Sequence, residues 1–354
     1  MRRFLLFVFA PLMAGCSTMS FYWQAFNGQM EVTRLARPLE EVVADPATSA
    51  DVKRRLDYAR LARDFASAEL GLPDNASYRR YADLKRPFVV WNVFAAPALS
   101  LELRTQCFPV AGCVVYRGFF AREAAESHAA TLRAAGLDVY VGGVPAYSTL
   151  GWFADPLLNT FIRYPDLEVA RLIFHELAHQ VAYVRDDSTF NESFAVAVED
   201  EGLRRWMLAN AGASDRASYA AYAARRRELM RLFVSTRREL GAVYAHPVDD
   251  GARRQAKTRI LNSLVDRYEA QKALWNLSEA QARVYDDWVL KDLNNAKLGS
   301  IATYTQRVPQ FAALLAANGG DLGRFYAAIA ALAALPKAER ERRLDQLSPL
   351  AKEE

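Results

Sequence analysis

Hydrophobic and polar positions follow two different periods along the chain, and these divide it into helical stretches around one strand-rich stretch. Residues 51–70 repeat apolar positions at helical spacing, from Leu56 to Leu70, and predict a helix. The pattern changes at Pro87, after which residues 88–94 are rich in β-branched and aromatic side chains, as is typical of a strand. The chain is therefore expected to combine helices with a small sheet.

The other expected elements follow the same two patterns. A hairpin, a helix closed by Gly136 and a further strand extend the sheet, and from residue 214 onward the chain is almost wholly helical. We predict an α+β fold that is mainly α, with a small mixed sheet followed by metal-site helices and a C-terminal helical part. The expected ranges are 78–84 and 122–135 for helices, 101–108 and 113–116 for the hairpin, and 137–141 for the strand.

One apolar run contains residues at metal-binding spacing. Residues 172–180 read Leu-Ile-Phe-His-Glu-Leu-Ala-His-Gln and hold the motif H-E-x-x-H. On a helix, expected over residues 165–184, His175 and His179 are four positions apart and project from one face. Glu176 lies beside them and can reach a zinc-bound water, so the run predicts the helix of a zinc metallopeptidase.

A second helix, expected over residues 190–209, offers a third ligand. Glu192 follows His179 by thirteen residues, and Glu199 lies two helical turns further on the same face. Two histidines and one glutamate leave a position open for water, as in a catalytic rather than a structural zinc site. We therefore predict Glu192 as the third zinc ligand and Glu199 as a residue that supports the ligands.

An alternative interpretation of Glu192 is a helix cap. Thr189 would be the N-cap residue of the second helix, and Glu192, three positions later, would complete a capping box. Taken alone, this local pattern favours the cap. The H-E-x-x-H motif that precedes it favours the ligand instead.

The second helix also carries the residues of a known motif. Asn191-Glu192-x-Phe194-Ala195-x-x-x-Glu199 resembles the second zinc motif of the gluzincin aminopeptidases. In that clan the first glutamate binds zinc and the later one supports the site. The chain departs from the best-known members by a shorter spacer between the motifs and by the absence of a G-A-M-E-N motif.

The chain as a whole is more similar to a bacterial lipoprotein family named "putative aminopeptidase". The similarity extends from Phe21 to Phe311. It implies a zincin-like core, in which an edge strand above the metal helix pairs with extended substrate. Residues 146–153, with Tyr147 and Gly151 as substrate-binding residues, are expected to form that strand; an ordinary connection between sheet and helix is the alternative.

The resemblance to gluzincins also suggests a residue that stabilises the oxyanion. These enzymes commonly use a tyrosine or histidine from the C-terminal helices, and Tyr304 is the candidate by analogy. Its alternative is a tyrosine packed between helices. The expected reaction is hydrolysis of a peptide bond, with one Zn²⁺ per chain and Glu176 as the general base.

The family name implies an aminopeptidase, which must hold the free α-amine of its peptide substrate. A carboxylate near the metal usually does so, and Asp155, Asp200 and Glu201 are the candidates. A periplasmic zinc endopeptidase would use the same core chemistry. A non-catalytic scaffold or binding lipoprotein with a structural metal site is a further alternative.

The N-terminus has the pattern of a targeting segment. Two arginines precede an apolar stretch over residues 4–12 that is short for a membrane span, and Ala-Gly directly before Cys16 resembles a bacterial lipobox. We expect a lipoprotein signal peptide over residues 1–15 and an exported protein, anchored to a membrane by lipid on Cys16 and facing the periplasm. An ordinary secretory signal is the alternative.

Charge and cysteines limit the remaining classes of function. The net charge of +4 includes two arginines of the signal segment, so the mature chain is close to neutral and no nucleic-acid partner is expected. In an oxidising periplasm Cys107 and Cys113 can form a disulfide, or they can remain two buried thiols. The expected organisation after the signal peptide is an N-terminal helical segment (16–85), a zincin-like catalytic core (86–210) and a C-terminal helical part packed on it (211–354).

Overall fold

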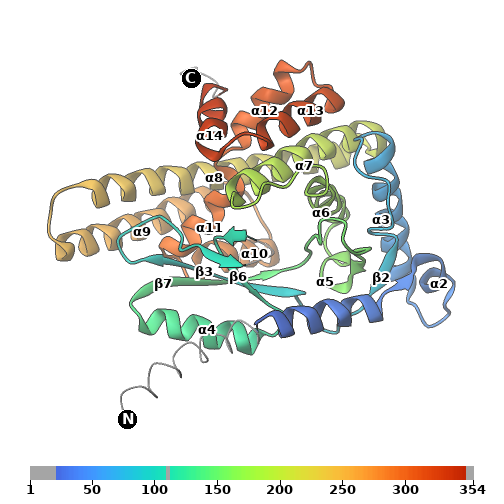
Figure 1. Ribbon diagram of the computed structural model, residues 1–354, viewed down its shortest axis with the longest axis horizontal. Helices are drawn as coiled ribbons and strands as arrows, with labels where there is room; N and C mark the ends of the chain where they lie inside the picture. Colours follow the sequence, from blue (N-terminus) through green and yellow to red (C-terminus); the bar gives the residue numbers. More distant parts are fainter. Residues whose placement is uncertain (1–20, 109–111, 348–354) are drawn as a thin grey trace, which may run out of the picture.

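The computed structural model describes residues 21–108 and 112–347, and it has the α+β, mainly α fold that the sequence predicts (Figure 1). The expected signal peptide over residues 1–15 and the expected lipidation site Cys16 lie outside the described residues. No helix in the described part of the chain is long and apolar enough to cross a membrane.

A three-stranded antiparallel sheet in the order β6-β3-β7 separates two layers of helices. The central strand β3 (Val90–Pro97) pairs along its whole length with β7 (Leu137–Val144) and over three residues with β6 (Arg117–Phe119). β6 therefore covers only part of one edge of β3, whereas β7 covers the whole of the other edge.

The two faces of this sheet carry different side chains. Because successive residues of a strand point to opposite faces, Trp91 and Val93 share one face, and they pack against α4 (Arg122–Ala134). Phe94 points to the opposite face, which α11 (Asn295–Thr305) covers. Figure 1 shows α4 below the sheet and α11 above it. The face beneath α11 is the one that borders the candidate site described below.

Two smaller sheets complete the β structure. β4 (Gln106–Phe108) and β5 (Gly112–Val114) form a hairpin, and a disulfide joins Cys107 to Cys113 across it. The other sheet has the order β1-β2-β8, in which β1 is antiparallel and β8 parallel to β2. Its strands are β1 (Arg37–Pro38), β2 (Arg80–Ala82) and β8 (Leu157–Leu158).

The prediction of a helix over residues 78–84 is wrong, because β2 lies there. Tyr81 and Ala82 pair with Leu157 and Leu158 of β8, far later in the chain. Tertiary pairing of this kind overrides a local helical pattern.

The prediction of an edge strand over residues 146–153 is also wrong. β7 ends before this segment, which instead turns, with Leu150 and Gly151 both at positive φ. The carboxylate of Asp155 accepts hydrogen bonds from the backbone N–H and the hydroxyl of Thr149, both at 2.8 Å. These bonds use the backbone locally, so the segment does not offer a free strand edge.

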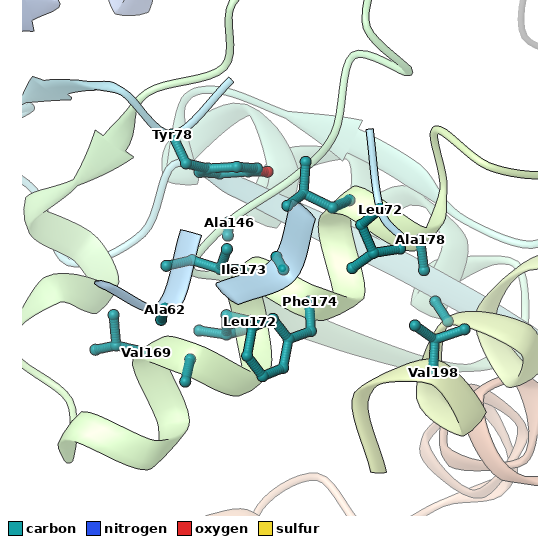
Figure 2. Close-up of a cluster of buried hydrophobic side chains, with 14 of the residues drawn as sticks. Ala62, Leu72, Tyr78, Ala146, Val169, Leu172, Ile173, Phe174, Ala178 and Val198 are labelled. Atoms are coloured by element: carbon teal, nitrogen blue, oxygen red, sulfur yellow. The ribbon is translucent and has the colours of Figure 1, made fainter. Parts of the chain in front are cut away.

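Two helices pack against each other in the largest core, α6 (Asp166–Ala178) and α7 (Ser188–Asn210). Figure 2 shows Leu172, Ile173 and Phe174 of α6 among buried side chains from several other elements. A helix that is apolar on nearly all sides is stable only when protein surrounds it. The apolar run of the H-E-x-x-H motif therefore fixes α6 in the interior.

α6 is shorter than the helix expected over residues 165–184. It begins directly after Pro165 and ends at Ala178. His179 is its C-cap residue and keeps helical backbone angles, with φ −60° and ψ −21°. The spatial relation between His175 and His179 is therefore still that of residues four apart on a helix.

The remaining helices surround this core in three groups. The N-terminal group packs on it directly, and α12–α14 pack over α7 at the end opposite to α4 (Figure 1). α8 and α9 form the long antiparallel pair of Figure 1 and share a second apolar cluster with α10 and α11. The bounds are residues 21–35 (helical), α2 (Leu39–Ala44), α3 (Ala50–Ala68), α5 (Asn159–Ile162), α8 (Ala213–Ala245), α9 (Asp250–Ala273), α10 (Glu279–Leu290), α12 (Val308–Ala317), α13 (Leu322–Ala333) and α14 (Lys337–Gln346).

Candidate metal centre

The two histidines of α6 turn their Nε2 atoms toward the same carboxylate of α7. Glu192 Oε2 lies 3.3 Å from His175 Nε2 and 3.6 Å from His179 Nε2. All three side chains are buried. One donor atom from each residue lies within 4.8 Å of the other two, which is the arrangement of a three-ligand metal site.

The start of α7 shows that Glu192 is not a helix cap. Asp187 is the N-cap residue, and its carboxylate accepts a hydrogen bond from the N–H of Phe190 at 3.1 Å. The helix therefore begins two residues earlier than a cap at Thr189 requires, and the capping-box alternative is wrong. The carboxylate of Glu192 is directed at the histidines instead of at the helix end.

Asn191, the neighbour of Glu192, fixes the connection between the two helices. Its side-chain oxygen accepts a hydrogen bond from the N–H of Val184 at 2.7 Å, and its amide donates one to the carbonyl of the same residue at 2.8 Å. Both groups belong to the loop that follows α6. This pair of bonds ties the end of the histidine segment to the first turns of α7 and so sets where Glu192 lies.

Glu199 supports His175 from the far side of its ring. Its Oε2 lies 2.8 Å from His175 Nδ1, and the same oxygen accepts a hydrogen bond from Arg171 at 2.9 Å. Arg226 of α8 donates to the other oxygen at 3.2 Å. When Nδ1 donates its proton to Glu199, the lone pair of Nε2 is free for a metal.

The charges of this cluster shift its pKa values strongly. Burial alone would raise the pKa of Glu199, but the Arg171 guanidinium and His175 hold it well below its usual range. Burial alone would lower the pKa of His175, yet its hydrogen bonds to Glu192 and Glu199 raise it. Burial raises the pKa of Glu176, whose carboxyl has less water to stabilise its charge. Buried carboxylates around two imidazoles thus form a site that favours a cation.

The donor set fits zinc. Two imidazole nitrogens and one carboxylate oxygen are the ligands of a common class of catalytic zinc site, and the carboxylate behind His175 matches the support that such ligands usually have. Softer or harder metals prefer thiolates or all-oxygen sites, respectively.

Tyr304 of α11 lies over this centre. Its ring stacks on that of His175, with 6.2 Å between the ring centroids. Burial raises the pKa of Tyr304 well above its usual value, so its hydroxyl keeps its proton. Glu192 and Glu176 are close enough to raise this pKa further. The structure therefore places a protonated phenol beside the candidate ligands that the sequence identified.

A cavity of about 1080 Å³ opens beside the centre. Its walls include His175, Glu176 and Glu192, the sheet face beneath α11, and the turn over residues 148–150. Tyr147 also lines it, and the hydroxyl of Tyr147 donates a hydrogen bond to the side-chain oxygen of Gln29. A volume of this size accommodates a peptide of several residues.

Gly151, expected to bind substrate, is not among the residues that line the cavity. Its φ of +82° serves the turn that follows Leu150. An added Cβ there would meet only the side chain of Gln180, at 3.5 Å, so the glycine is required by its backbone conformation and not by a close approach.

A comparison with protein-family models matches residues 20–344 to the family described as "Putative aminopeptidase". The chain belongs to this family. The match covers nearly all described residues, including the metal centre and both groups of C-terminal helices. Searches of curated proteins and of solved structures found no match.

The three carboxylates expected to hold the α-amine of an aminopeptidase substrate have other partners. Asp155 accepts two hydrogen bonds from Thr149, Asp200 pairs with Arg226 at 3.2 Å, and Glu201 pairs with Arg204 at 2.7 Å. None of the three is among the described residues that line the cavity. The structure therefore does not bring them to the metal centre.

Sequence reasoning missed several residues of the site. Arg171 could have been found, because it precedes His175 by four positions and so shares its helix face. Arg226 and Lys297 carry no such local signal, since α8 and α11 reach the site only through tertiary packing. The Arg-rich stretch of α8 has the pattern of a solvated basic face, yet one of its arginines contacts Glu199.

Proposed function

We propose that the protein is a zinc metallopeptidase that hydrolyses peptide bonds. The observation that carries the proposal is the convergence of His175, His179 and Glu192 on one point at the wall of the cavity, with Glu176 and Tyr304 beside it. Membership of the aminopeptidase family supports the reaction class.

Zinc in this site would polarise the scissile carbonyl and lower the pKa of the attacking water. Glu176 accepts the proton of that water while the water oxygen forms its bond to the carbonyl carbon. Glu176 then delivers the proton to the leaving amine as the C–N bond breaks. Its raised pKa suits both steps, because a carboxyl that releases protons less readily is a stronger base.

Tyr304 acts on the carbonyl oxygen. Its protonated hydroxyl donates a hydrogen bond as negative charge develops on that oxygen, which stabilises the transition state more than the substrate. The stacking of its ring on His175 holds the phenol in place before substrate arrives.

The family name favours removal of N-terminal residues, and we propose aminopeptidase activity on that ground. One observation favours an endopeptidase as the second candidate. Among the described residues that line the cavity, the only carboxylates are Glu176 and Glu192, and both have roles at the metal centre. Peptides with a free and with an acetylated N-terminus distinguish the two, because an aminopeptidase cleaves only the first.

The decisive experiment combines metal content with activity in the purified mature protein. We expect one zinc per chain in the wild type, loss of zinc in Glu192→Ala, and retention of zinc with at least a hundredfold loss of peptidase activity in Glu176→Gln. Glu341→Gln, an exposed glutamate of α14, is the matched control and should behave as the wild type. Full activity of Glu176→Gln would exclude this residue as the base, and zinc retained in Glu192→Ala would exclude it as a ligand.

We also propose that the protein is exported and held on a membrane by lipid on Cys16. The lipobox-like sequence supports this placement. So does the exposed apolar side of the helix over residues 21–35, which begins at the fifth residue after Cys16.

A further inference from the structure

The cavity beside the metal centre has an uneven distribution of charge. Its described lining contains no acidic side chain other than Glu176 and Glu192. Four basic side chains also line it: Arg171, Arg185, Arg226 and Lys297. A substrate that fills the cavity beyond the metal therefore meets positive charge.

Arg171 and Arg226 already form ion pairs with Glu199. Lys297 has different surroundings. Its side chain is 1% exposed, and its ammonium donates one hydrogen bond, to the carbonyl oxygen of Lys291. It also lies 5.3 Å from the ring centroid of Tyr140. Within residues 21–108 and 112–347, no carboxylate forms an ion pair with it.

A buried ammonium with one hydrogen bond is incompletely satisfied. It has three donors, and burial of a charge is costly unless an opposite charge or several acceptors compensate for it. Burial lowers the pKa of Lys297 to about 8, so the group is still mainly charged at neutral pH. The side chain thus places charge and free donors at a wall of the cavity. Asp292 is close enough to raise the pKa of Lys297, but among the described residues it forms no ion pair with it and does not line the cavity.

The position of Lys297 on α11 relates it to the point of cleavage. Tyr304 lies seven residues further on, which places both residues on one side of the helix, about 10 Å apart along its axis. An extended peptide advances by about 3.4 Å per residue, so about three residues span this interval. Aromatic side chains also line this cavity, where Phe94 contacts Tyr140 and Tyr116 with centroid distances of 6.1 Å and 5.5 Å.

We propose that Lys297 binds a carboxylate of the substrate peptide, about three residues from the bond that is cleaved. This inference rests on the proposed peptidase function and names its substrate class, which is peptides that carry a carboxylate at this distance. The carboxylate is either the C-terminal group of a short peptide or an acidic side chain within a longer one. Both form the same charge-assisted hydrogen bonds with an ammonium.

Three peptides of one sequence test the inference. The first has an amidated C-terminus and no acidic side chain, the second a free C-terminus three residues from the cleaved bond, and the third an amidated C-terminus with a glutamate at that position. For the wild type we expect KM to be at least about tenfold lower for the second or the third peptide than for the first. Whichever of these two peptides has the lower KM shows whether Lys297 binds the C-terminal carboxylate or an acidic side chain.

Variants then assign this preference to Lys297. Lys297→Met should bring the KM values of the three peptides close together, whereas Lys297→Arg should retain part of the preference. Lys337→Met, which removes an exposed lysine on α14, is the matched control and should keep the full preference.

Two results would overturn the inference. The first is equal KM values for all three peptides in the wild type. This result needs no variant, so it is decisive even if Lys297→Met fails to fold. The second is a preference that survives in folded Lys297→Met. If no peptide is cleaved, the proposed function fails, but calorimetric affinities of the same peptides for the wild type and Lys297→Met still decide whether this lysine binds a carboxylate.

Discussion

At the scale of single residues, the carboxylate of Glu199 on α7 contacts side chains of both α6 and α8, and one of these is the candidate ligand His175. Its carboxylate is fully buried and contacts His175, Arg171 and Arg226. Two guanidinium groups keep it ionised despite its burial, and an ionised acceptor both orients the imidazole and makes it a stronger ligand. In the proposed zinc site Glu199 would therefore act on the metal through His175 and would not bind the metal itself.

We expect Glu199→Gln to weaken zinc binding by about tenfold to a hundredfold. An amide can still accept a hydrogen bond from His175, but it carries no charge, so Arg171 and Arg226 keep only Glu168 and Asp200 as carboxylate partners. Competition with a chelator measures the zinc Kd directly. Glu201→Gln, on the same helix but paired with Arg204 and Arg205, should leave the Kd unchanged. An unchanged Kd in Glu199→Gln would show that the contact with His175 has no influence on the metal.

At the scale of elements, the C-terminal helix α14 holds the start of α7. Arg340 donates two hydrogen bonds to one carboxylate oxygen of Asp187, at 2.7 Å and 3.0 Å, and both side chains are buried. Asp187 is also the N-cap of α7, five residues before Glu192. One aspartate thus joins α14 to the first turn of α7, the helix that carries the candidate third ligand.

Arg340→Leu is expected to lower the free energy of unfolding by about 3–5 kcal/mol, because it leaves Asp187 as an unpaired buried charge. Chemical denaturation measures this change. Arg342→Leu, on the same helix but with a more exposed side chain, should lower the free energy of unfolding by less than about 1 kcal/mol.

A second variant tests whether stability is lost because Asp187 keeps an unpaired charge or because its contact with Arg340 is missing. Asp187→Asn keeps an N-cap side chain but carries no charge, so adding it to Arg340→Leu should restore part of the lost stability. A double variant that is less stable than Arg340→Leu alone would show that the buried charge is not the cause of the loss.

The elements also show which features a sequence can predict. The positions of His175 and His179 relative to each other follow from helical spacing alone, and the motif around Glu192 predicted a neighbouring helix that the structure contains. β2 could not be predicted, because its strand conformation depends on pairing with β8. The turn over residues 146–153 depends in the same way on the side chain of Asp155. Local patterns thus predicted the two helices of the candidate metal centre, whereas contacts between residues distant in sequence determine the structure around them.

At the scale of the whole molecule, the helix over residues 21–35 has two different sides. On one side Phe21 stacks on Phe108 with 4.8 Å between the ring centroids, and Gly28 lies against the ring of Phe120. The other side exposes three large apolar residues at positions i, i+3 and i+7: Trp23, Phe26 and Met30, which are 66%, 57% and 41% exposed. Apolar side chains in such a row on one helix face are typical of a surface that lies on lipid.

The position of this face agrees with a lipid on Cys16. Trp23 is the seventh residue after Cys16, so the chain between them spans at most about 25 Å. A membrane that holds the lipid is therefore within reach of the apolar face. A single acyl chain gives only weak binding, and a second contact of this kind would strengthen it.

We expect the wild type to fractionate with membranes, and Cys16→Ser, exported from the same cells, to be released in large part. In the lipid-free protein, replacement of Trp23, Phe26 and Met30 by serine should reduce binding to phospholipid vesicles at least about tenfold, because it removes the apolar area that enters the lipid. Serine at Leu208, Leu274 and Val284, three exposed apolar residues elsewhere, is the matched control and should leave vesicle binding unchanged. Equal vesicle binding by both triple variants would show that this helix face does not contact the membrane, and Cys16→Ser that stays with the membrane fraction would exclude the lipid anchor.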